Sequence, residues 1–217
     1  MRYFIFLILC GLVGQTAQAQ KAFEGSLFFN IQMKGQQAAV LAENEPNKKM
    51  TMHIKDGDYV VHLSGGRVPK TFLFIADSNY EYSIDGLNER AYRFSPHTDL
   101  NQEKGKEVVP TAVATGRTDT IKGLPCAEYK MVKDKTTFYY YVSDRVRVDL
   151  SSFPENCVAK PSFLIKGLDG RIPLKSVRKM PGLIVATTIT KMARKDLQKE
   201  QFLIPPFFDI KNRDYRY

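Results

Sequence analysis

The stretch from Thr120 to Ser143, TIKGLPCAEYKMVKDKTTFYYYVS, carries the clearest structural signal in this 217-residue sequence. It is typical of a β-hairpin, with Cys126 near the start of its first strand and an aromatic run from Phe138 to Tyr141 in its second. Side chains alternate between the two faces of a strand, so Phe138 and Tyr140 are expected to share one face. We expect the hairpin to lie in the middle of a sheet and to tie the two halves of the chain together.

Alternation of apolar and polar residues predicts strands on the N-terminal side of this hairpin. Asp56-Gly57 stands between two alternating runs, a strong signal for a tight hairpin turn. The run from Lys70 to Ala76 is apolar on both faces, which is typical of a strand with neighbours on both sides. The strands predicted here are Phe23–Met33, Met50–Ile54, Tyr59–Leu63, Lys70–Ala76, Tyr80–Ile84 and Arg90–Phe94.

The C-terminal part of the chain continues the pattern, and two segments have helical character instead. Further strands are predicted at Thr115–Ile121, Arg145–Leu150, Arg171–Val177 and Gly182–Lys191. Gln36–Glu43 has helix-forming composition, and Ala193–Gln201 is polar and suited to one or two helical turns. The polar segment Ser95–Pro110 is predicted to be a long loop.

These elements predict a mainly β protein built on a single curved antiparallel sheet, a half-barrel or barrel with one or two short helices. About ten strands exceed what an open twisted sheet usually holds flat, so the sheet should curl or split. We find no low-complexity linker, composition shift or repeat, and one β-rich domain over residues 20–217 is the simplest arrangement.

The first nineteen residues resemble a targeting signal and are not expected to be part of the folded domain. A positively charged start, an apolar run from Phe4 to Val13 and small residues ending at Ala19 are typical of a secretory signal peptide, residues 1–19. The apolar run is about 10 residues, whereas a membrane-spanning helix needs roughly 20. We therefore expect cleavage after Ala19, no transmembrane segment in the mature chain, and a periplasmic or secreted protein.

Export would leave two cysteines, Cys126 and Cys157, in an oxidising compartment where a disulfide is allowed. Such a bridge would close a loop of about 30 residues and contribute about 3–4 kcal/mol in the chain-entropy model. The alternative is two unpaired thiols, one of them buried.

The formal net charge is +9, or +8 without Arg2. The basic residues are scattered along the sequence among Asp and Glu. No Lys/Arg cluster dominates, and outside the cytoplasm nucleic acid is not an expected partner. A mild attraction to anionic lipid head groups or lipopolysaccharide is the expected consequence.

The sequence carries no catalytic signature. His53, His62 and His97 have no partner at metal-ligand spacing, and no Gly-x-Ser-x-Gly elbow is present. We therefore predict no metal, no cofactor and no enzymatic activity. A hydrolase built from scattered carboxylates, or from Cys126 as a nucleophile, stays open as a less favoured hypothesis.

An excess of aromatic side chains in the predicted strands allows two interpretations. They either fill a two-sided core or line an apolar cavity on the concave face of a curved sheet. Tyrosines would suit the wet rim of such a cavity. The candidate ligand-binding residues are Phe72, Phe74, Tyr80, Tyr82, Phe138 and Tyr140.

Several short motifs, in order along the chain, resemble an uncharacterised family of exported domains common in Gram-negative bacteria of the Bacteroidetes type. The motifs that resemble this family are Ile121–Tyr129 (IKGLPCAEY), Ile54–Leu63 (IKDGDYVVHL), Gly167–Leu174 and Phe202–Pro205 (FLIP). Met180–Ile184 (MPGLI) also resembles the core motif of the related GLPGLI proteins, although Lys179-Met180 replaces the Gly-Leu of that motif.

The resemblance implies the fold of LolA and LolB, the periplasmic carrier and receptor of lipoproteins, in which a curved antiparallel sheet surrounds an apolar cavity plugged by helices. It implies no catalytic residues. The predicted function is thus an exported binding protein for a lipid or a lipoprotein acyl chain. The alternative is a structural or interaction module of the cell envelope with a packed core.

Overall fold

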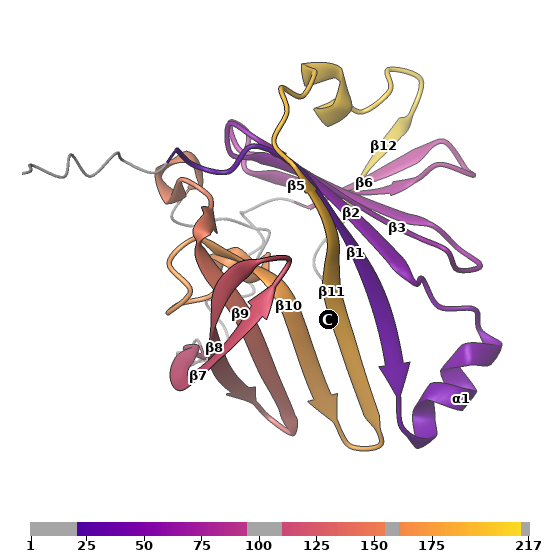
Figure 1. The fold of residues 1–217 in the computed structure, drawn as a ribbon. Helices are drawn as coiled ribbons and strands as arrows, with labels where there is room; N and C mark the ends of the chain where they lie inside the picture. The colour runs from indigo at the N-terminus through magenta and orange to yellow at the C-terminus, as the bar shows by residue number, and fades with distance from the viewer. Residues whose placement is uncertain (1–20, 95–109, 155–160, 214–217) are drawn as a thin grey trace, which may run out of the picture.

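The computed structural model describes residues 21–94, 110–154 and 161–213. The predicted signal peptide, most of the predicted loop Ser95–Pro110, Cys157 and His97 lie outside the described residues. Over the described residues the fold is mainly β, with twelve strands in one sheet and one α-helix (Figure 1). The strands are β1 Gly25–Lys34, β2 Lys49–Lys55, β3 Asp58–Ser64, β4 Lys70–Ile75, β5 Tyr80–Asp85, β6 Arg90–Phe94, β7 Val113–Ile121, β8 Leu124–Lys133, β9 Thr136–Arg147, β10 Arg171–Met180, β11 Leu183–Ala193 and β12 Asp209–Arg213.

Within the described residues, helical structure is limited to short pieces. The helix α1, Gln36–Glu43, has the predicted bounds. Three 3-10 turns accompany it: η1 Leu150–Ser152, η2 Ser162–Leu164 and η3 Lys199–Phe202. The predicted helical segment Ala193–Gln201 therefore contributes one 3-10 turn near its end, because β11 extends to Ala193 and takes the start of that segment into the sheet.

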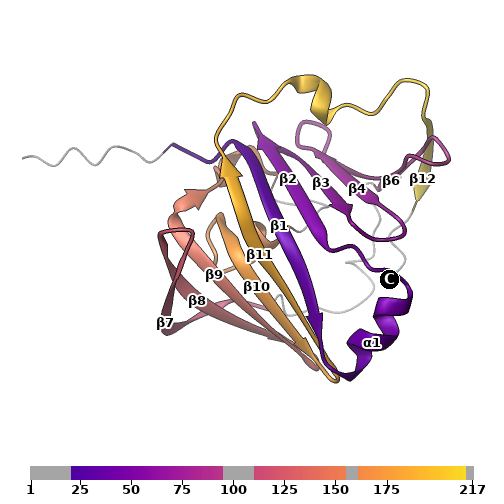
Figure 2. The same cartoon turned by 45° about the vertical axis from the view of Figure 1, so that its right-hand side comes forward.

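The strand order is β12-β6-β5-β4-β3-β2-β1-β11-β10-β9-β8-β7. Every pairing is antiparallel except that of β12 with β6, which is parallel. The sheet curls into a half-barrel and is not closed, since β12 and β7 are its two edges (Figures 1 and 2). The half-barrel prediction is thus confirmed, and the closed alternative is wrong.

Two meanders meet at the centre of the sheet. The first runs from β1 to β6 and the second from β7 to β11, and the pairing of β1 with β11 joins them. The hairpin Thr120–Ser143, predicted to lie mid-sheet, instead forms β8 and β9 close to the β7 edge. Each hairpin is predicted by residues that are close together in the sequence. The central position is instead occupied by β1 and β11, which are far apart in the sequence, so no local pattern predicts their pairing.

Two other local predictions are refined by the structure. The turn at Asp56-Gly57 has φ of 50° and 86°, so both residues occupy the left-handed region that a two-residue hairpin turn of this type requires. The predicted strand Arg145–Leu150 is not separate, because β9 continues from the aromatic run as far as Arg147. A register irregularity around Pro173 of the neighbouring β10 accommodates this long strand.

The core occupies both faces of the sheet, in different places. On the inner, concave face, Phe153 after η1 and Phe163 in η2 pack on Tyr59 and Phe74. On the outer face of β3 to β6, the segment containing Leu197 and η3 covers a second cluster. The outer face of β1, β11, β10, β9 and β8 has no helix across it in either view (Figures 1 and 2).

Candidate functional site

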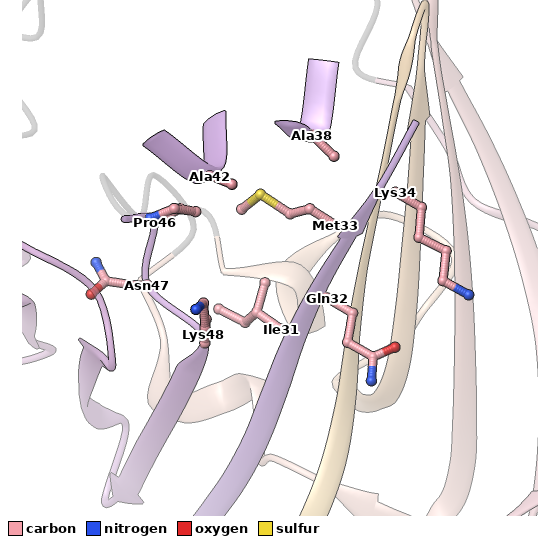
Figure 3. Close-up of a pocket in the computed structure, with 9 residues that line it drawn as sticks. All are labelled: Ile31, Gln32, Met33, Lys34, Ala38, Ala42, Pro46, Asn47 and Lys48. Carbon is pink, nitrogen blue, oxygen red and sulfur yellow. The ribbon is translucent and has the colours of Figure 1, made fainter. Parts of the chain in front are cut away.

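A cavity of about 350 Å³ lies between α1 and the end of β1 (Figure 3). This volume is at the lower end of the range of roughly 300–1,000 Å³ that is typical of small-molecule sites. The residues that line it are Ile31, Gln32, Met33, Lys34, Ala38, Ala42, Pro46, Asn47 and Lys48.

Two periodicities give the cavity its apolar lining. On β1, Ile31 and Met33 point towards α1, whereas Gln32 and Lys34 point to the other side of the strand (Figure 3). On α1, Ala38 and Ala42 are four residues apart and so lie on one side of the helix. Strand and helix therefore present methyl, methylene and thioether groups to the same space, and the small alanines leave it unfilled.

The helix α1 is held loosely over this space. None of its residues is buried, and Val40 is 61% exposed. The amide of Gln37 donates to the carbonyl of Gly182 in the β10–β11 turn at 3.0 Å. The residue before the helix must be glycine, because Gly35 has φ of 109° and a Cβ there would lie 2.5 Å from the Gly182 oxygen. These anchors fix one end of a helix that otherwise lacks a packed core.

One polar atom in the cavity wall is unsatisfied. The Nδ2 of Asn47 donates to the carbonyl of Val68 at 3.0 Å. The Oδ1 of Asn47 is buried and accepts no hydrogen bond within the part of the chain that the structure describes. A buried acceptor without a donor costs about 1–3 kcal/mol. The Asn47 side chain points away from Ile31 and Met33, so this oxygen does not face the cavity (Figure 3).

The inner face continues from the cavity across the sheet. Met33 pairs with Val185, Val185 with Arg178, and Arg178 with Phe138 in successive strands. Val185 and Phe138 are half-buried, whereas Arg178 is exposed and forms no ion pair in the described residues. Neighbouring strands are roughly 5 Å apart, so Arg178 lies about 10 Å from Met33. The row thus combines a partly open apolar track with one cation.

The six predicted ligand-binding residues do not converge on this cavity. Phe74 is fully buried on the inner face, and Phe72, two residues earlier on the same strand, is half-buried there. Tyr80 and Tyr82 lie on the outer face, packed against the cluster containing Phe202. That these side chains contact a ligand stays a prediction. None of the six lines the cavity under α1.

Phe138 and Tyr140 share the inner face, as alternation predicts. Their rings stack with centroids 6.1 Å apart, and Tyr140 packs in a cluster with Leu168 and Ala112. Burial raises the pKa of Tyr140 to about 12, an effect that the charge of Arg178 opposes. Tyr140 is thus packed in the core of the inner face, whereas Phe138 stays half-buried at its edge.

Cys126 is buried and forms no disulfide within the described residues, and burial raises the pKa of its thiol. A raised pKa is the opposite of what activates a cysteine nucleophile. Since Cys157 lies outside the described residues, the predicted disulfide stays a prediction and receives no support from the structure.

The two described histidines make hydrogen bonds to hydroxyl groups. His53 Nδ1 is 2.7 Å from Ser26 Oγ, and His62 Nδ1 is 3.0 Å from Thr71 Oγ1. Burial lowers the pKa of both rings. Among the residues that the structure describes, no group of three or more His, Cys, Asp or Glu side chains is placed to hold a metal ion.

The cavity under α1 was not predicted, although the sequence contains part of its signal. The alternation of β1 places Met33 on the apolar face, and the composition of Gln36–Glu43 predicts the helix. What the sequence lacks is the angle at which α1 folds back after Gly35. The alanine side chains of α1 also do not indicate a binding site, because alanine is common in helices of every kind.

Known protein structures share this architecture. PNGF-II matches with a TM-score of 0.52 and 14% identity over 88% of this chain, which spans only 31% of the PNGF-II chain. An uncharacterized conserved protein from Thermus thermophilus matches with a TM-score of 0.50 and 9% identity, over 88% of this chain and 91% of that one. The lipoprotein LppX from Mycobacterium tuberculosis has a lower TM-score of 0.36, with 8% identity over 81% of this chain and 89% of that one.

At these identities the first two likenesses describe the fold alone. No protein-family model and no curated protein matches the sequence. The resemblance of the short motifs to exported Bacteroidetes-type domains and GLPGLI proteins therefore stays a prediction. Within the described residues, no helix has the length and apolar character needed to cross a bilayer.

Proposed function

We propose that this protein is an exported, non-enzymatic binding protein that holds a lipid or a lipoprotein acyl chain in the cavity between α1 and β1. The observation that carries the proposal is the cavity itself, lined by Ile31, Met33 and the alanines of α1. Burial of a hydrocarbon chain there would remove apolar surface from water on both partners, at roughly 25 cal/mol per Å².

The weak packing of α1 supports the same proposal. A helix with no buried residue can move at low cost, and a bound chain would give it the apolar contacts that it lacks. Arg178, about 10 Å from Met33 across the inner face, would suit the carboxylate or phosphate of an amphiphile whose tail lies under α1.

The first experiment asks whether the protein carries a ligand. Native mass spectrometry of the purified protein, before and after organic extraction, is expected to show a lipid adduct that extraction removes. Displacement of a fluorescent fatty acid then gives an affinity. A protein that is always empty and that binds no fatty acid would contradict the proposal.

Two tryptophan substitutions on α1 locate the site. Ala38→Trp places an indole in the cavity and is expected to weaken fatty-acid binding more than tenfold. Ala39→Trp, on the adjacent exposed residue, is the matched control and should leave the affinity within about twofold. Equal affinities of the two variants would place the ligand elsewhere.

A second candidate function is an interaction module of the cell envelope. It is favoured by β7, an edge strand whose residues are all exposed except Ile121. An exposed edge can add a strand from a partner chain. A co-purifying protein together with an empty cavity would support this alternative against the lipid carrier.

A further inference from the structure

Lysines from three strands share the outer face of the second meander and β1, across which no helix lies (Figures 1 and 2). Lys34 in β1 lies opposite Ile184 in β11, which lies opposite Lys179 in β10. One row along the strands, Lys130 in β8 lies opposite Tyr139 in β9. Because side chains alternate, all of these point away from the cavity under α1, as Figure 3 shows for Lys34.

A third row across the strands also contains a lysine beside a tyrosine. Lys175 in β10 lies opposite Tyr141 in β9, which lies opposite Glu128 in β8. We call the surface formed by Lys34, Lys130, Lys175 and Lys179 the lysine face. Strands in a sheet are roughly 5 Å apart, so these lysines project from the same face of the sheet within a few strands of one another.

The accessible charge of these rows is positive. Glu128 is only 4% exposed, and its carboxylate accepts hydrogen bonds from Tyr141 Oη at 2.5 Å and Thr115 Oγ1 at 2.9 Å. Lys175 pairs with Asp119 of the edge strand at 3.3 Å. Lys34, Lys130 and Lys179 are exposed and form no ion pair in the described residues.

Between the lysines lie apolar and aromatic groups. The Nζ of Lys179 is 4.9 Å from the centre of the Tyr139 ring, and the Nζ of Lys175 is 4.5 Å from that of Tyr141. Ile184 is 38% exposed at the centre of the first row. The surface therefore offers flexible cations on long aliphatic stems above amphipathic rings, without a pocket shaped for one molecule.

We propose that the lysine face docks on an anionic lipid bilayer. Lysine is a flexible point charge, suited to phosphate groups that are mobile in the plane of a membrane, whereas a fixed anion is better held by the fork of arginine. Each lysine near an anionic bilayer contributes attraction, and tyrosine rings suit the head-group level. The row through Lys34 immediately precedes α1, so docking would hold that helix near the head groups.

Vesicle co-sedimentation tests the proposal. The intact mature protein is mixed with vesicles of phosphatidylcholine alone, or of phosphatidylcholine with phosphatidylglycerol, at low and high salt. We expect binding to the anionic vesicles only, and its loss as salt screens the charges. Absence of binding to the anionic vesicles would overturn the proposal.

A matched pair of triple variants separates the lysine face from net charge. K34Q/K130Q/K179Q removes three exposed lysines of the face, and K70Q/K166Q/K199Q removes three exposed lysines elsewhere. The first variant is expected to weaken vesicle binding by roughly 10- to 100-fold, and the second by less than about threefold. Equal weakening by both would assign the attraction to net charge and overturn the proposal.

Two further measurements keep the outcome unambiguous. Thermal unfolding of both triple variants is expected to match that of the parent, because all six lysines are exposed. If the parent bound heparin but not anionic vesicles, and the first variant lost heparin binding, the face would take a soluble polyanion and the membrane proposal would fail. Ala38→Trp should retain vesicle binding, so failure of the cavity proposal is distinguishable from failure of this one.

Discussion

Phe74 shows how a single residue anchors the inner core. It is fully buried, with its ring 5.3 Å from that of Tyr59 and 6.2 Å from that of Phe153, measured between centroids. Phe74→Ala is expected to lower the free energy of unfolding by about 3–5 kcal/mol, because it leaves a cavity among rings that cannot all relax. Urea unfolding followed by circular dichroism measures the loss.

Phe72 is the control for that substitution, because it lies on the same strand and face but is only half-buried. Phe72→Ala should cost about 1–2 kcal/mol. If the two substitutions cost the same, the packing around Phe74 does not have the importance that its burial indicates.

Also at the residue scale, the half-buried Tyr141 and the buried Glu128 form a polar pair. The Tyr141 hydroxyl donates to the Glu128 carboxylate and is the main cause that lowers the pKa of this carboxyl from its ordinary 4.5. Burial raises the pKa of Tyr141 to about 12, so the hydroxyl stays protonated at pH 7. A lowered folded-state pKa stabilises the fold above about pH 4.5, and this stabilisation is lost as the pH falls through the folded-state pKa.

Tyr141→Phe is therefore expected to cost about 1–3 kcal/mol at pH 7 and clearly less at an acidic pH below the lowered folded-state pKa of the Glu128 carboxyl group. Urea unfolding at the two pH values checks both magnitudes. Tyr139→Phe, which keeps its ring beside Lys179, should be nearly neutral at either pH. A cost for Tyr141→Phe that did not change with pH would show that the hydroxyl stabilises the fold without the charge on Glu128.

At the scale of the element, α1 has little tertiary support. It has no buried residue and no side-chain cap at its N-terminus. Ala39→Gly, on its exposed side, should destabilise the helix by about 1 kcal/mol. Hydrogen exchange of the α1 amides is then expected to accelerate about fivefold through local opening, while β1 exchange and the global unfolding midpoint stay unchanged. Protection of α1 as strong as that of β1 would contradict a loosely held helix.

At the scale of the whole molecule, the pairing of β1 with β11 makes the two meanders one cooperative unit. The inner core contains Phe74 of the first meander and Leu174 of the second. Ile189→Ala, in β11 and 3% exposed, is expected to cost about 2–5 kcal/mol and to destabilise both meanders equally. Hydrogen exchange of peptides from β4 and β10 under mildly denaturing conditions measures each half separately.

Ile184→Ala serves as the control for this prediction, because Ile184 lies on the same strand but is 38% exposed on the outer face. Its cost should be within about 0.5–1 kcal/mol. If Ile189→Ala weakened only the β10 peptides, the meanders would be independent folding units despite their shared sheet.

Much of the fold follows from local sequence pattern. Alternation along most of β1 to β6, and the apolar run of β4, predict these strands, and Asp56-Gly57 gives a turn with two positive φ angles. The short strand β12 was missed, because its residues Asp209–Arg213 are all exposed and show no alternation that burial would impose. Its strand geometry comes from the neighbouring β6.

The sequence by itself determined the class of fold, the hairpins and the helix α1, because each depends on residues close together in the chain. Tertiary structure decided that β1 and β11 occupy the centre, that the hairpin at Thr120–Ser143 lies near an edge, and that α1 leaves a cavity over Met33. The physical reason is the same in each case. Contacts between distant segments form where they bury the apolar faces of all the elements together. A local hydrophobic period contains no information about which distant segments will meet.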